Sequence, residues 1–317
     1  MKFQKVLMVL TITTLIFTGC AKKDKRHVII FHAGSLSVPM KHLEEAFEEQ
    51  NPGVDVLREA SGSRSAARKV SDLHRDCDIM ASADSTVIHN LLIPEYAEFC
   101  VDFATNEMVL MHREDSRYAD KINGQNWYTI LLKDEVHYGH SDPDKDPCGY
   151  RSQLVWQLAE IHHNEKGLYD RLKEQCPPKY VRPKETDLIA LLESKVLDYI
   201  FIYRSVAVQH HMPFVELPPQ VSLGSPDYSE FYNRAAIKVS GKKPGETIEH
   251  RGKPIVYGIT LVKEPVNKPD AIAFLKFMLG EKGRQIINTD GQKPVNPPVT
   301  GEYDMLPAEL KSTVEKK

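Results

Sequence analysis

The sequence has few cysteines, few tryptophans and almost no excess of charge. Only 5 of its 317 residues are Cys and 2 are Trp, and no two cysteines have the C-x-x-C spacing of a zinc site. Acidic residues number 44 and basic residues 41, so the formal net charge is −3. This balance gives no support to nucleic-acid binding, which usually needs a basic face. Anion binding stays open, because backbone N–H groups and hydroxyls can bind an anion without net charge.

Signature motifs of nucleotide-binding proteins and of common hydrolases are also missing. The serine-rich segments match neither the G-x-x-x-x-G-K-[ST] loop nor the G-x-G-x-x-G fingerprint, so nucleotides are not indicated. They lie near no G-x-S-x-G, H-E-x-x-H or S-x-x-K motif, so a serine hydrolase or a metallohydrolase has no support. We therefore predict a protein that is not an enzyme, with no catalytic residues and no cofactor.

One long apolar run is present, and it lies at the N-terminus. Residues 6–17 are apolar apart from threonines, and Lys2 and Lys5 precede them. This run is shorter than the ~20 residues of a membrane span, so residues 1–19 are predicted to be a signal peptide. The segment 17–20, Phe-Thr-Gly-Cys, resembles a bacterial lipobox, although Phe17 stands where Leu is usual. The alternative is a plain signal peptide followed by an unmodified cysteine.

The lipobox resemblance implies a lipoprotein. Cys20 would carry the lipid, and the charged residues 20–26 would form a tether to the membrane. The mature protein would then be periplasmic or extracytoplasmic, anchored through Cys20 alone. In such an oxidising compartment the remaining four cysteines could form disulfides, in three possible pairings, or could stay as buried free thiols. These cysteines are Cys77, Cys100, Cys148 and Cys176.

From residue 27 onward, short apolar runs alternate with segments that have helical spacing. Strands are predicted at 28–31, 54–57 and 78–82, each followed by a helical pattern, which indicates an open parallel sheet covered by helices. The second half repeats this alternation, and a surface hairpin is predicted at 235–250. The length favours about two domains. Further strands are predicted at 108–111, 136–141, 197–203 and 255–262, and further helices at 127–132, 154–161, 188–192, 271–279 and 283–288.

Two of the predicted strands end in segments rich in Ser and Gly, at 34–37 and 61–63. Ligands of open α/β sheets bind beyond the carboxyl ends of strands, and a helix N-terminus carries unpaired N–H groups and a partial positive charge. Two such segments could therefore bind a small oxyanion, or their serines could simply cap helices. A third segment, 141–152, has three aspartates but lacks the Gly and Glu of an EF-hand, so by itself it indicates a solvated turn and a helix cap.

Six segments resemble one family. They are HAGSLSVPM at 32–40, EASGSRSAARKV at 59–70, ASAD at 81–84, SDPDKDPCGYRS at 141–152, FIYRSVA at 201–207 and IVYGITL at 255–261. In this order they resemble extracytoplasmic tungstate/molybdate-binding proteins of the WtpA type, related to ModA. The resemblance implies an α/β type II periplasmic-binding-protein fold with a ligand cleft between two α/β lobes. We expect residues 27–105 plus 264–317 to form lobe 1 and residues 106–263 to form lobe 2.

The resemblance also implies a function and a set of site residues. The protein would deliver its anion to an ABC transporter permease with a cytoplasmic ATPase, and we expect it to act as a monomer. Glu185 rests on a short match, and Asp187 is the alternative. From the residues alone, Asp146 could instead be a helix cap and Glu185 an exposed acid in a first helical turn. The implied oxyanion-binding residues are Ser35, Ser63 and Tyr203, and the implied ligands of Mo or W are Asp146 and Glu185.

Two carboxylates beside a dianion need a chemical reason. Like charges ~4 Å apart repel by about 4 kcal/mol at an effective dielectric constant of 20. The repulsion is offset if the carboxylate oxygens bond the central atom, and Mo or W can expand from four to six oxygen ligands. Sulfur and phosphorus cannot, so the two acids would favour tungstate and molybdate over sulfate and phosphate. The alternatives are a carrier of sulfate or phosphate, and a ferric-ion carrier of similar fold.

Overall fold

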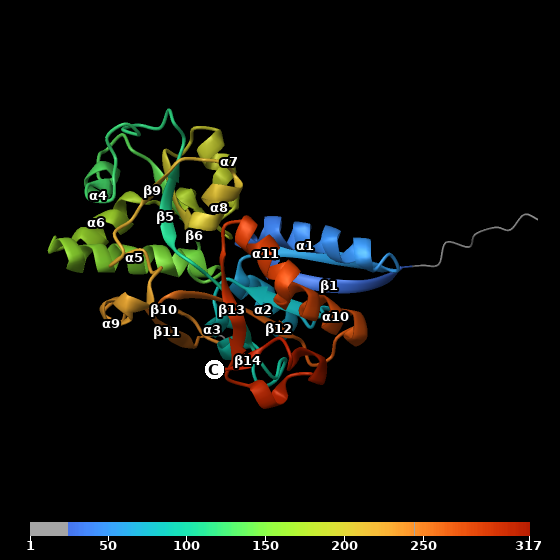
Figure 1. The fold of residues 1–317 in the computed structure, drawn as a ribbon. Coiled ribbons are helices and arrows are strands. Elements are labelled where there is room, and N and C mark those ends of the chain that lie inside the picture. Colours follow the sequence, from blue (N-terminus) through green and yellow to red (C-terminus); the bar gives the residue numbers. More distant parts are fainter. Residues whose placement is uncertain (1–24, 244) are drawn as a thin grey trace, which may run out of the picture.

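The computed structural model describes residues 25–243 and 245–317 (Figure 1). The predicted signal peptide, Cys20 and residues 20–24 of the predicted tether lie outside the described residues. Arg26, the last residue of that tether, instead begins β1 (Arg26–Ala33) and forms an ion pair with Asp270, with Nε 2.6 Å from Oδ2. No helix in the described ranges is both long enough and apolar enough to cross a membrane.

The larger sheet has seven strands in the order β14-β13-β4-β12-β3-β1-β2. Strand β1 lies between β3 and the edge strand β2 and is parallel to both, whereas the central strand β12 runs antiparallel to β3 and β4. The sheet thus combines strands from the two ends of the described chain. The strands are β1, β2 (Val54–Ser61), β3 (Ile79–Ser82), β4 (Val101–Asn106), β12 (Ile255–Leu261), β13 (Lys293–Thr300) and β14 (Glu315–Lys316).

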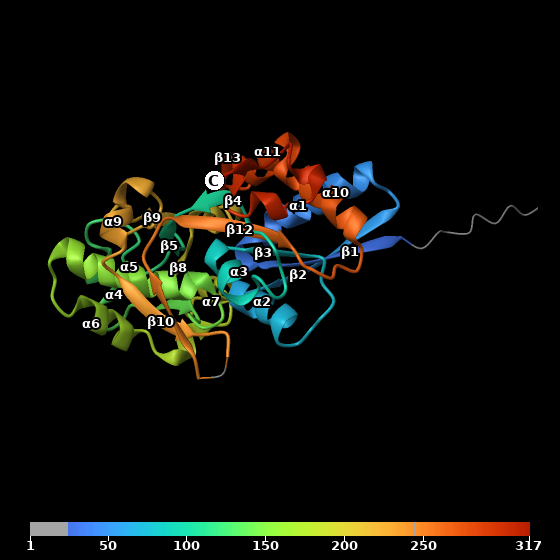
Figure 2. The same cartoon turned by 90° about the horizontal axis from the view of Figure 1, so that it is seen from below.

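Helices cover both faces of this sheet (Figures 1 and 2). On β1, Val28 and Ile30 belong to the core that includes α1 and α10, whereas Phe31 belongs to the core that includes α2 and α3. Successive side chains of a strand point to opposite faces, so a strand buried on both faces is apolar throughout. The helices are α1 (Ser37–Gln50), α10 (Lys268–Leu279) and α11 (Glu281–Thr289) on one side, and α2 (Ser63–Ser71) and α3 (Ser85–Leu91) on the other.

The smaller sheet has five strands in the order β7-β6-β8-β5-β9. Its core is aromatic, because Trp127 and Trp156 pack edge-on against Phe201, with ring centroids 5.8 and 5.6 Å away. The strands are β5 (Met108–His112), β6 (Tyr138–Ser141), β7 (Val181–Arg182), β8 (Tyr199–Tyr203) and β9 (Phe214–Glu216). The helices of this part are α4 (Trp127–Leu131), α5 (Pro147–His163), α6 (Leu168–Gln175), α7 (Asp187–Glu193), α8 (Arg204–Gln209) and α9 (Ser229–Tyr232).

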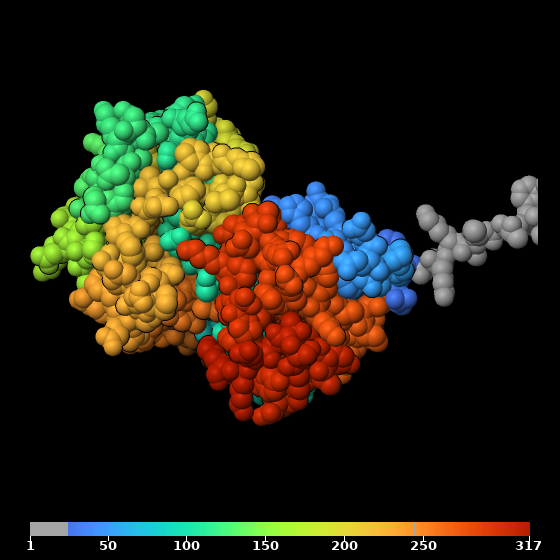
Figure 3. All heavy atoms as spheres, viewed as in Figure 1, coloured from blue at the N-terminus to red at the C-terminus, as the bar shows by residue number. Residues whose placement is uncertain are grey.

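The chain passes from the larger sheet to the smaller one between β4 and β5 and returns before β12. The predicted hairpin is confirmed as β10 (Ala236–Ser240) and β11 (Thr247–Arg251), which pair antiparallel. The lobe boundary expected at residue 263 does not match the strand pairing, because β12 pairs with β3 and β4 of the larger sheet. Figure 3 shows the parts built on the two sheets in contact along their boundary.

Three strands of the larger sheet, β4, β13 and the two-residue β14, escaped prediction. β13 contains Pro294, Pro297 and Pro298, and proline argues against a strand because it has no N–H to donate. In the structure the pairing of β13 with β4 is interrupted between Pro294 and Val299, so the prolines fall within an irregular stretch. β4 has the sequence VDFATN, and its polar residues break the apolar pattern from which a buried strand is predicted. In the structure the strand is nevertheless almost completely buried. The four cysteines whose disulfide state the sequence left open are free thiols, and all four are buried.

Candidate functional site

Residues of the candidate site lie where the two sheet-containing parts meet. The N-terminal turn of α2 touches the loop before α5: the backbone N–H groups of Arg64 and Ser65 donate to the Lys145 carbonyl oxygen, with N···O distances of 3.1 and 3.2 Å. Arg64 also donates through Nε to the Asp144 carbonyl oxygen, 3.0 Å away, and through Nη2 to the carbonyl oxygen of Ser240 in the hairpin. These bonds hold the two parts against each other.

The five residues expected to bind the oxyanion or its central atom are all buried. Their exposed fractions are between 0% and 1%, although all five are polar or acidic. Polar side chains are rarely buried to this extent unless they have partners. Ser35 follows β1, Ser63 begins α2, and Asp146, Glu185 and Tyr203 come from the part that contains the smaller sheet.

The two serines do not cap helices, so the capping alternative is wrong for both. Ser35 lies in a short 3-10 turn and accepts a hydrogen bond from the Tyr257 hydroxyl, with an Oη···Oγ distance of 3.0 Å. Ser63 accepts from the backbone N–H of Ala83, also at 3.0 Å, and neither α1 nor α2 has a side-chain cap. Each hydroxyl therefore accepts one bond from the protein and keeps its own proton for donation.

Asp146 connects the two acids. It caps α5 by accepting from the Cys148 N–H at 3.3 Å, which confirms the cap predicted from the residues alone. Its other oxygen accepts from the backbone N–H of Glu185, 2.9 Å away, so the loops carrying the two acids are joined at this point. Burial raises the pKa of Asp146 above its ordinary value.

Glu185 is the most unusual side chain of the site. It is fully buried, and neither carboxyl oxygen has a hydrogen-bond partner among the described residues. Burial, followed by the negative charge of Asp146, raises the pKa of Glu185 well above its ordinary value. A buried acceptor without a partner is costly, by about 1–3 kcal/mol and more for a charged group. Such a group fits a site that receives a further polar or metal-centred ligand.

The structure distinguishes the two candidates for the second acid. Asp187 begins α7, its side chain is 37% exposed, and it forms an ion pair with Lys184 at 3.4 Å. Glu185 lies inside, beside Asp146, so the alternative of an exposed first-turn acid is wrong for it. Of the two, only Glu185 faces the other candidate residues.

Tyr203 ends β8, and its hydroxyl accepts a hydrogen bond from Arg151 Nη1 at 2.8 Å. Burial raises the pKa of Tyr203 well above its ordinary value, although the Arg151 charge opposes the shift. The hydroxyl therefore stays protonated and can donate its hydrogen. Its ring lies 5.9 Å from that of Tyr257, so Tyr203 and the partner of Ser35 are neighbours.

Three residues that the motifs did not single out hold Ser35 in place. Tyr257 on β12 donates to the Ser35 hydroxyl and accepts from Asn106 Nδ2 at 3.1 Å. Gln292 donates through Nε2 to the Ser35 carbonyl oxygen at 3.0 Å, and its Oε1 has no partner among the described residues. Tyr257 lies inside the recognised segment at 255–261 but looks like a core aromatic. No sequence pattern pointed to Gln292.

A buried ion cluster links the two parts beside the site. Asp84 caps α3, and the Tyr150 hydroxyl donates to its Oδ2 at 2.6 Å. Arg151 Nη2 lies 3.1 Å from the same oxygen, and Lys253 Nζ lies 3.4 Å from Oδ1. Arg151 also donates to the Ala83 carbonyl oxygen at 2.6 Å. We call Asp84, Tyr150, Arg151 and Lys253 the Asp84 cluster.

The charges of this cluster act mainly on Asp84. Burial by itself would raise the pKa of Asp84, but Lys253 and Arg151, with the Tyr150 hydroxyl, lower it far below the ordinary value of 3.8. Asp84 is therefore ionised at neutral pH although it is only 1% exposed. Arg151 is 2% exposed, so its charge is also buried and is balanced by Asp84.

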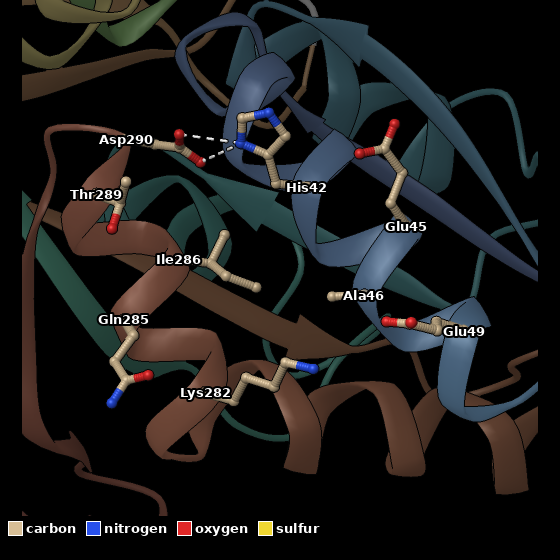
Figure 4. A pocket seen from close by; sticks show the side chains of 9 residues that line it. All are labelled: His42, Glu45, Ala46, Glu49, Lys282, Gln285, Ile286, Thr289 and Asp290. Carbon is tan, nitrogen blue, oxygen red and sulfur yellow. Dashed lines mark hydrogen bonds and ion pairs between the residues drawn. The ribbon is translucent and has the colours of Figure 1, made fainter.

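A separate groove of about 670 Å³ lies on the surface between α1 and α11 (Figure 4). In it His42 Nδ1 lies 3.0 and 2.9 Å from the two carboxyl oxygens of Asp290. None of the five expected site residues lines this groove. Within residues 25–243 and 245–317, no group of three or more His, Cys, Asp or Glu side chains could hold a resident metal ion.

Comparisons with known proteins show the family to which the chain belongs. Residues 28–293 match the family model described as "Bacterial extracellular solute-binding protein". An uncharacterised solute-binding protein of Petrotoga mobilis is 54% identical over 309 residues, covering 98% of this chain and 95% of that protein. A protein of Thermococcus kodakarensis named molybdate/tungstate-binding protein WtpA is 43% identical over 315 residues, covering 91% of this chain and 87% of the relative.

Among solved structures, the periplasmic molybdate-binding protein of Azotobacter vinelandii superposes with a TM-score of 0.59. It is 17% identical, and the match covers 84% of this chain and 98% of that protein. At this identity the likeness concerns the fold. It confirms the predicted fold class, an α/β periplasmic-binding-protein fold with two separate sheets.

The Asp84 cluster generates a prediction about stability. Replacing Asp84 by Asn keeps a helix cap but leaves the buried Arg151 charge unpaired, so the free energy of unfolding should fall by about 3 kcal/mol at neutral pH. The pKa of Asp84 is lower in the folded protein than in the unfolded chain. The advantage of the wild type is therefore complete above the ordinary pKa of 3.8 and shrinks as the pH falls below it. Urea unfolding between about pH 7 and pH 3 measures this difference.

The matched control is Asp115→Asn. Asp115 pairs with Lys195, but its side chain is 54% exposed, so its removal should leave the free energy of unfolding nearly unchanged. A difference between wild type and Asp84→Asn that stayed constant down to pH 3 would contradict the ion-pair explanation.

Proposed function

The chain belongs to the family of bacterial extracellular solute-binding proteins, and we propose that it captures tungstate or molybdate outside the cytoplasm for delivery to an ABC importer. Proteins of this family are transport proteins and not enzymes, and those of ABC transporters work with a permease and its ATPase. The observation that supports the choice of anion is the buried pair of acids, Asp146 and Glu185, which lie beside the glycines that precede Ser35 and Ser63.

The anion's outer oxygens would be bound by hydroxyl groups. Ser35 and Ser63 each accept a bond from the protein and can donate their own protons, and Tyr203 is held protonated by burial. A tungstate or molybdate oxygen accepts such bonds, and hydrogen bonds to a charged acceptor contribute more than neutral ones. These three residues would therefore grip the anion through its oxygens, whatever its central atom.

The central atom would be selected by the acids. An ionised Glu185 beside Asp146 and a dianion is strongly unfavourable unless its oxygens gain a positive partner. Hexavalent W or Mo offers that partner, because it accepts two carboxylate oxygens in addition to its own four. The central atoms of sulfate and phosphate accept no carboxylate oxygens. An ionised carboxylate beside either anion would therefore only repel it.

The two alternative cargoes fit the residues less well. A carrier of sulfate or phosphate needs donors around the anion, whereas the buried acids add acceptor oxygens, and those of Glu185 have no donor among the described residues. A ferric-ion carrier would need several phenolate ligands. The hydroxyls of Tyr203 and Tyr257 are both engaged in hydrogen bonds with neighbouring side chains, and burial raises the pKa of each.

Delivery would depend on the contact between the two parts. The bonds from Arg64 and Ser65 to Lys145, and those of Arg151 to Ala83 and Asp84, form only when the parts are closed. We propose that the anion stabilises this closed form, so that the permease distinguishes loaded from empty protein. We further propose that the protein acts as a monomer, held near the permease by a lipid on Cys20.

The proposed cargo can be tested by titration. Isothermal calorimetry of the mature protein should give strong binding for tungstate and molybdate, and little or none for sulfate and phosphate at the same concentrations. The physical reason is the carboxylate coordination described above. Binding of sulfate or phosphate alone would end the proposal.

The role of the acids can be tested by two substitutions. Asp146→Asn and Glu185→Gln each remove a negative ligand of the metal, so each should weaken tungstate binding by roughly 10- to 100-fold. Each should also reduce the preference for tungstate over sulfate. Tungsten X-ray absorption should count six oxygen neighbours in the wild type and fewer in each variant.

Asp187→Asn is the matched control, because Asp187 lies two positions from Glu185 but at the surface. It should leave both affinities within about twofold of the wild type. Unchanged selectivity in both Asp146→Asn and Glu185→Gln would remove the acids from the mechanism.

The lipid anchor is a separate prediction. Cys20→Ser removes the thiol that would carry the lipid, so the protein should move from the membrane fraction to the soluble fraction of cells, with tungstate affinity unchanged. Labelling with a radioactive fatty acid should mark the wild type and not the variant. A wild-type protein that takes up no label would refute lipidation at Cys20.

A further inference from the structure

Two glycines precede the two serines of the site. Gly34 comes before Ser35, and Gly62 comes before Ser63. Neither has the positive φ that makes glycine necessary, and Gly62 has φ −59° and ψ 140°, which most residues adopt. Backbone conformation therefore does not explain why glycine stands at these two positions.

Each glycine packs directly against one acid of the site. A Cβ atom on Gly34 would lie 3.0 and 3.1 Å from Glu185 Oε2 and Oε1. A Cβ atom on Gly62 would lie 2.4 Å from the Lys145 carbonyl oxygen and 2.9 Å from Asp146 Cβ. All four distances are shorter than an ordinary van der Waals contact of a carbon atom. Each acid therefore lies in the space that a side chain on the facing glycine would fill.

We infer that Gly34 is a specificity-determining residue, which lets Glu185 reach the anion's central atom, and that Gly62 lets the loop that carries Asp146 close on the site. The inference rests on the proposed function, since it assumes a cargo whose central atom binds carboxylates. The two glycines place no group on the anion. They act by leaving room for the acids, and a methyl group on either would shorten an acid's reach.

The two contacts differ in what can move. Gly62 faces backbone: the Lys145 carbonyl oxygen that a methyl would meet also accepts the bonds from Arg64 and Ser65. A methyl there forces the two parts of the protein away from each other. Gly34 faces a carboxylate and the Thr186 hydroxyl, which lies 3.0 Å from the ideal Cβ position. Side chains can rotate, so a methyl at residue 34 displaces the Glu185 carboxylate while the parts still close.

This difference predicts distinct effects. Gly34→Ala should weaken tungstate binding by about 10-fold and reduce the preference for tungstate over sulfate. Gly62→Ala should weaken binding of every anion, by about 100-fold for tungstate, because the closed form is lost. Small-angle X-ray scattering should show tungstate-induced compaction in the wild type and in Gly34→Ala, and none in Gly62→Ala.

A double-mutant cycle tests whether Gly34 acts through Glu185. The cycle compares the wild type, Gly34→Ala, Glu185→Ala and the double variant by calorimetry with tungstate. In Glu185→Ala no carboxylate remains for the methyl to displace, so adding Gly34→Ala should change the affinity by less than about twofold. If Gly34→Ala also lowers the Tm, the double variant should restore part of that loss, since the contacts with the Glu185 carboxylate are gone and only the one with the Thr186 hydroxyl remains.

Gly301→Ala is the matched control, because no atom lies within 4 Å of its ideal Cβ position and its φ is not positive. It should bind tungstate as the wild type does. The inference would be overturned if Gly34→Ala lowered the tungstate affinity equally with and without the Glu185 carboxylate. It would also be overturned if Gly62→Ala bound tungstate with wild-type affinity and became compact on binding. A wild type that binds no tungstate or molybdate would instead refute the proposed function, so the two failures are distinguishable.

Discussion

The structure depends on the burial of two acids without a cation beside them. Among the described residues neither Asp146 nor Glu185 has an ion-pair partner, and the carboxyl oxygens of Glu185 have no hydrogen-bond partner either. Burial raises the pKa of both acids, because an isolated charge is among the most unfavourable features that the interior of a folded protein can contain. They persist here because the surrounding backbone fixes them: Asp146 caps α5 and accepts from the Glu185 N–H. In the function proposed above, a ligand whose central atom accepts carboxylate oxygens would offset this unfavourable burial.

The cations near the site do not relieve the acids, because they are engaged elsewhere. Arg151 and Lys253 pair with Asp84, and Arg64 donates to backbone carbonyl oxygens. One set of charges thus joins the two parts of the protein, and another faces the cargo. This separation lets the protein close through the Asp84 cluster while the Asp146–Glu185 pair stays available for the anion.

The architecture brings these residues together from distant segments of the chain. Ser35 and Ser63 follow β1 and β2, Asp146 and Glu185 precede α5 and α7, and Tyr203 ends β8. Both sheets present the carboxyl ends of parallel strands to the region between them, as is usual for ligand sites in open α/β folds. The close approach of the two sides at Gly34 and Gly62 then determines how near the acids lie to the serines.

The sequence by itself determined the alternation of strands and helices, the hairpin at 236–251 and, through its motifs, the family. These are local patterns of apolar spacing and turn residues, which do not depend on distant partners. Two other features depend on strand pairing within the larger sheet. β13 is a strand despite its prolines because it pairs with β4, and the chain returns to the larger sheet after β11 because β12 pairs there. Only the tertiary structure placed Glu185, and not Asp187, beside Asp146. It also brought Tyr257 and Gln292 into hydrogen bonds with Ser35. Finally, it packed the two glycines, Gly34 and Gly62, against the two acids. Burial and contact are properties of the folded chain, because the residues concerned are between 39 and 257 positions apart in the sequence.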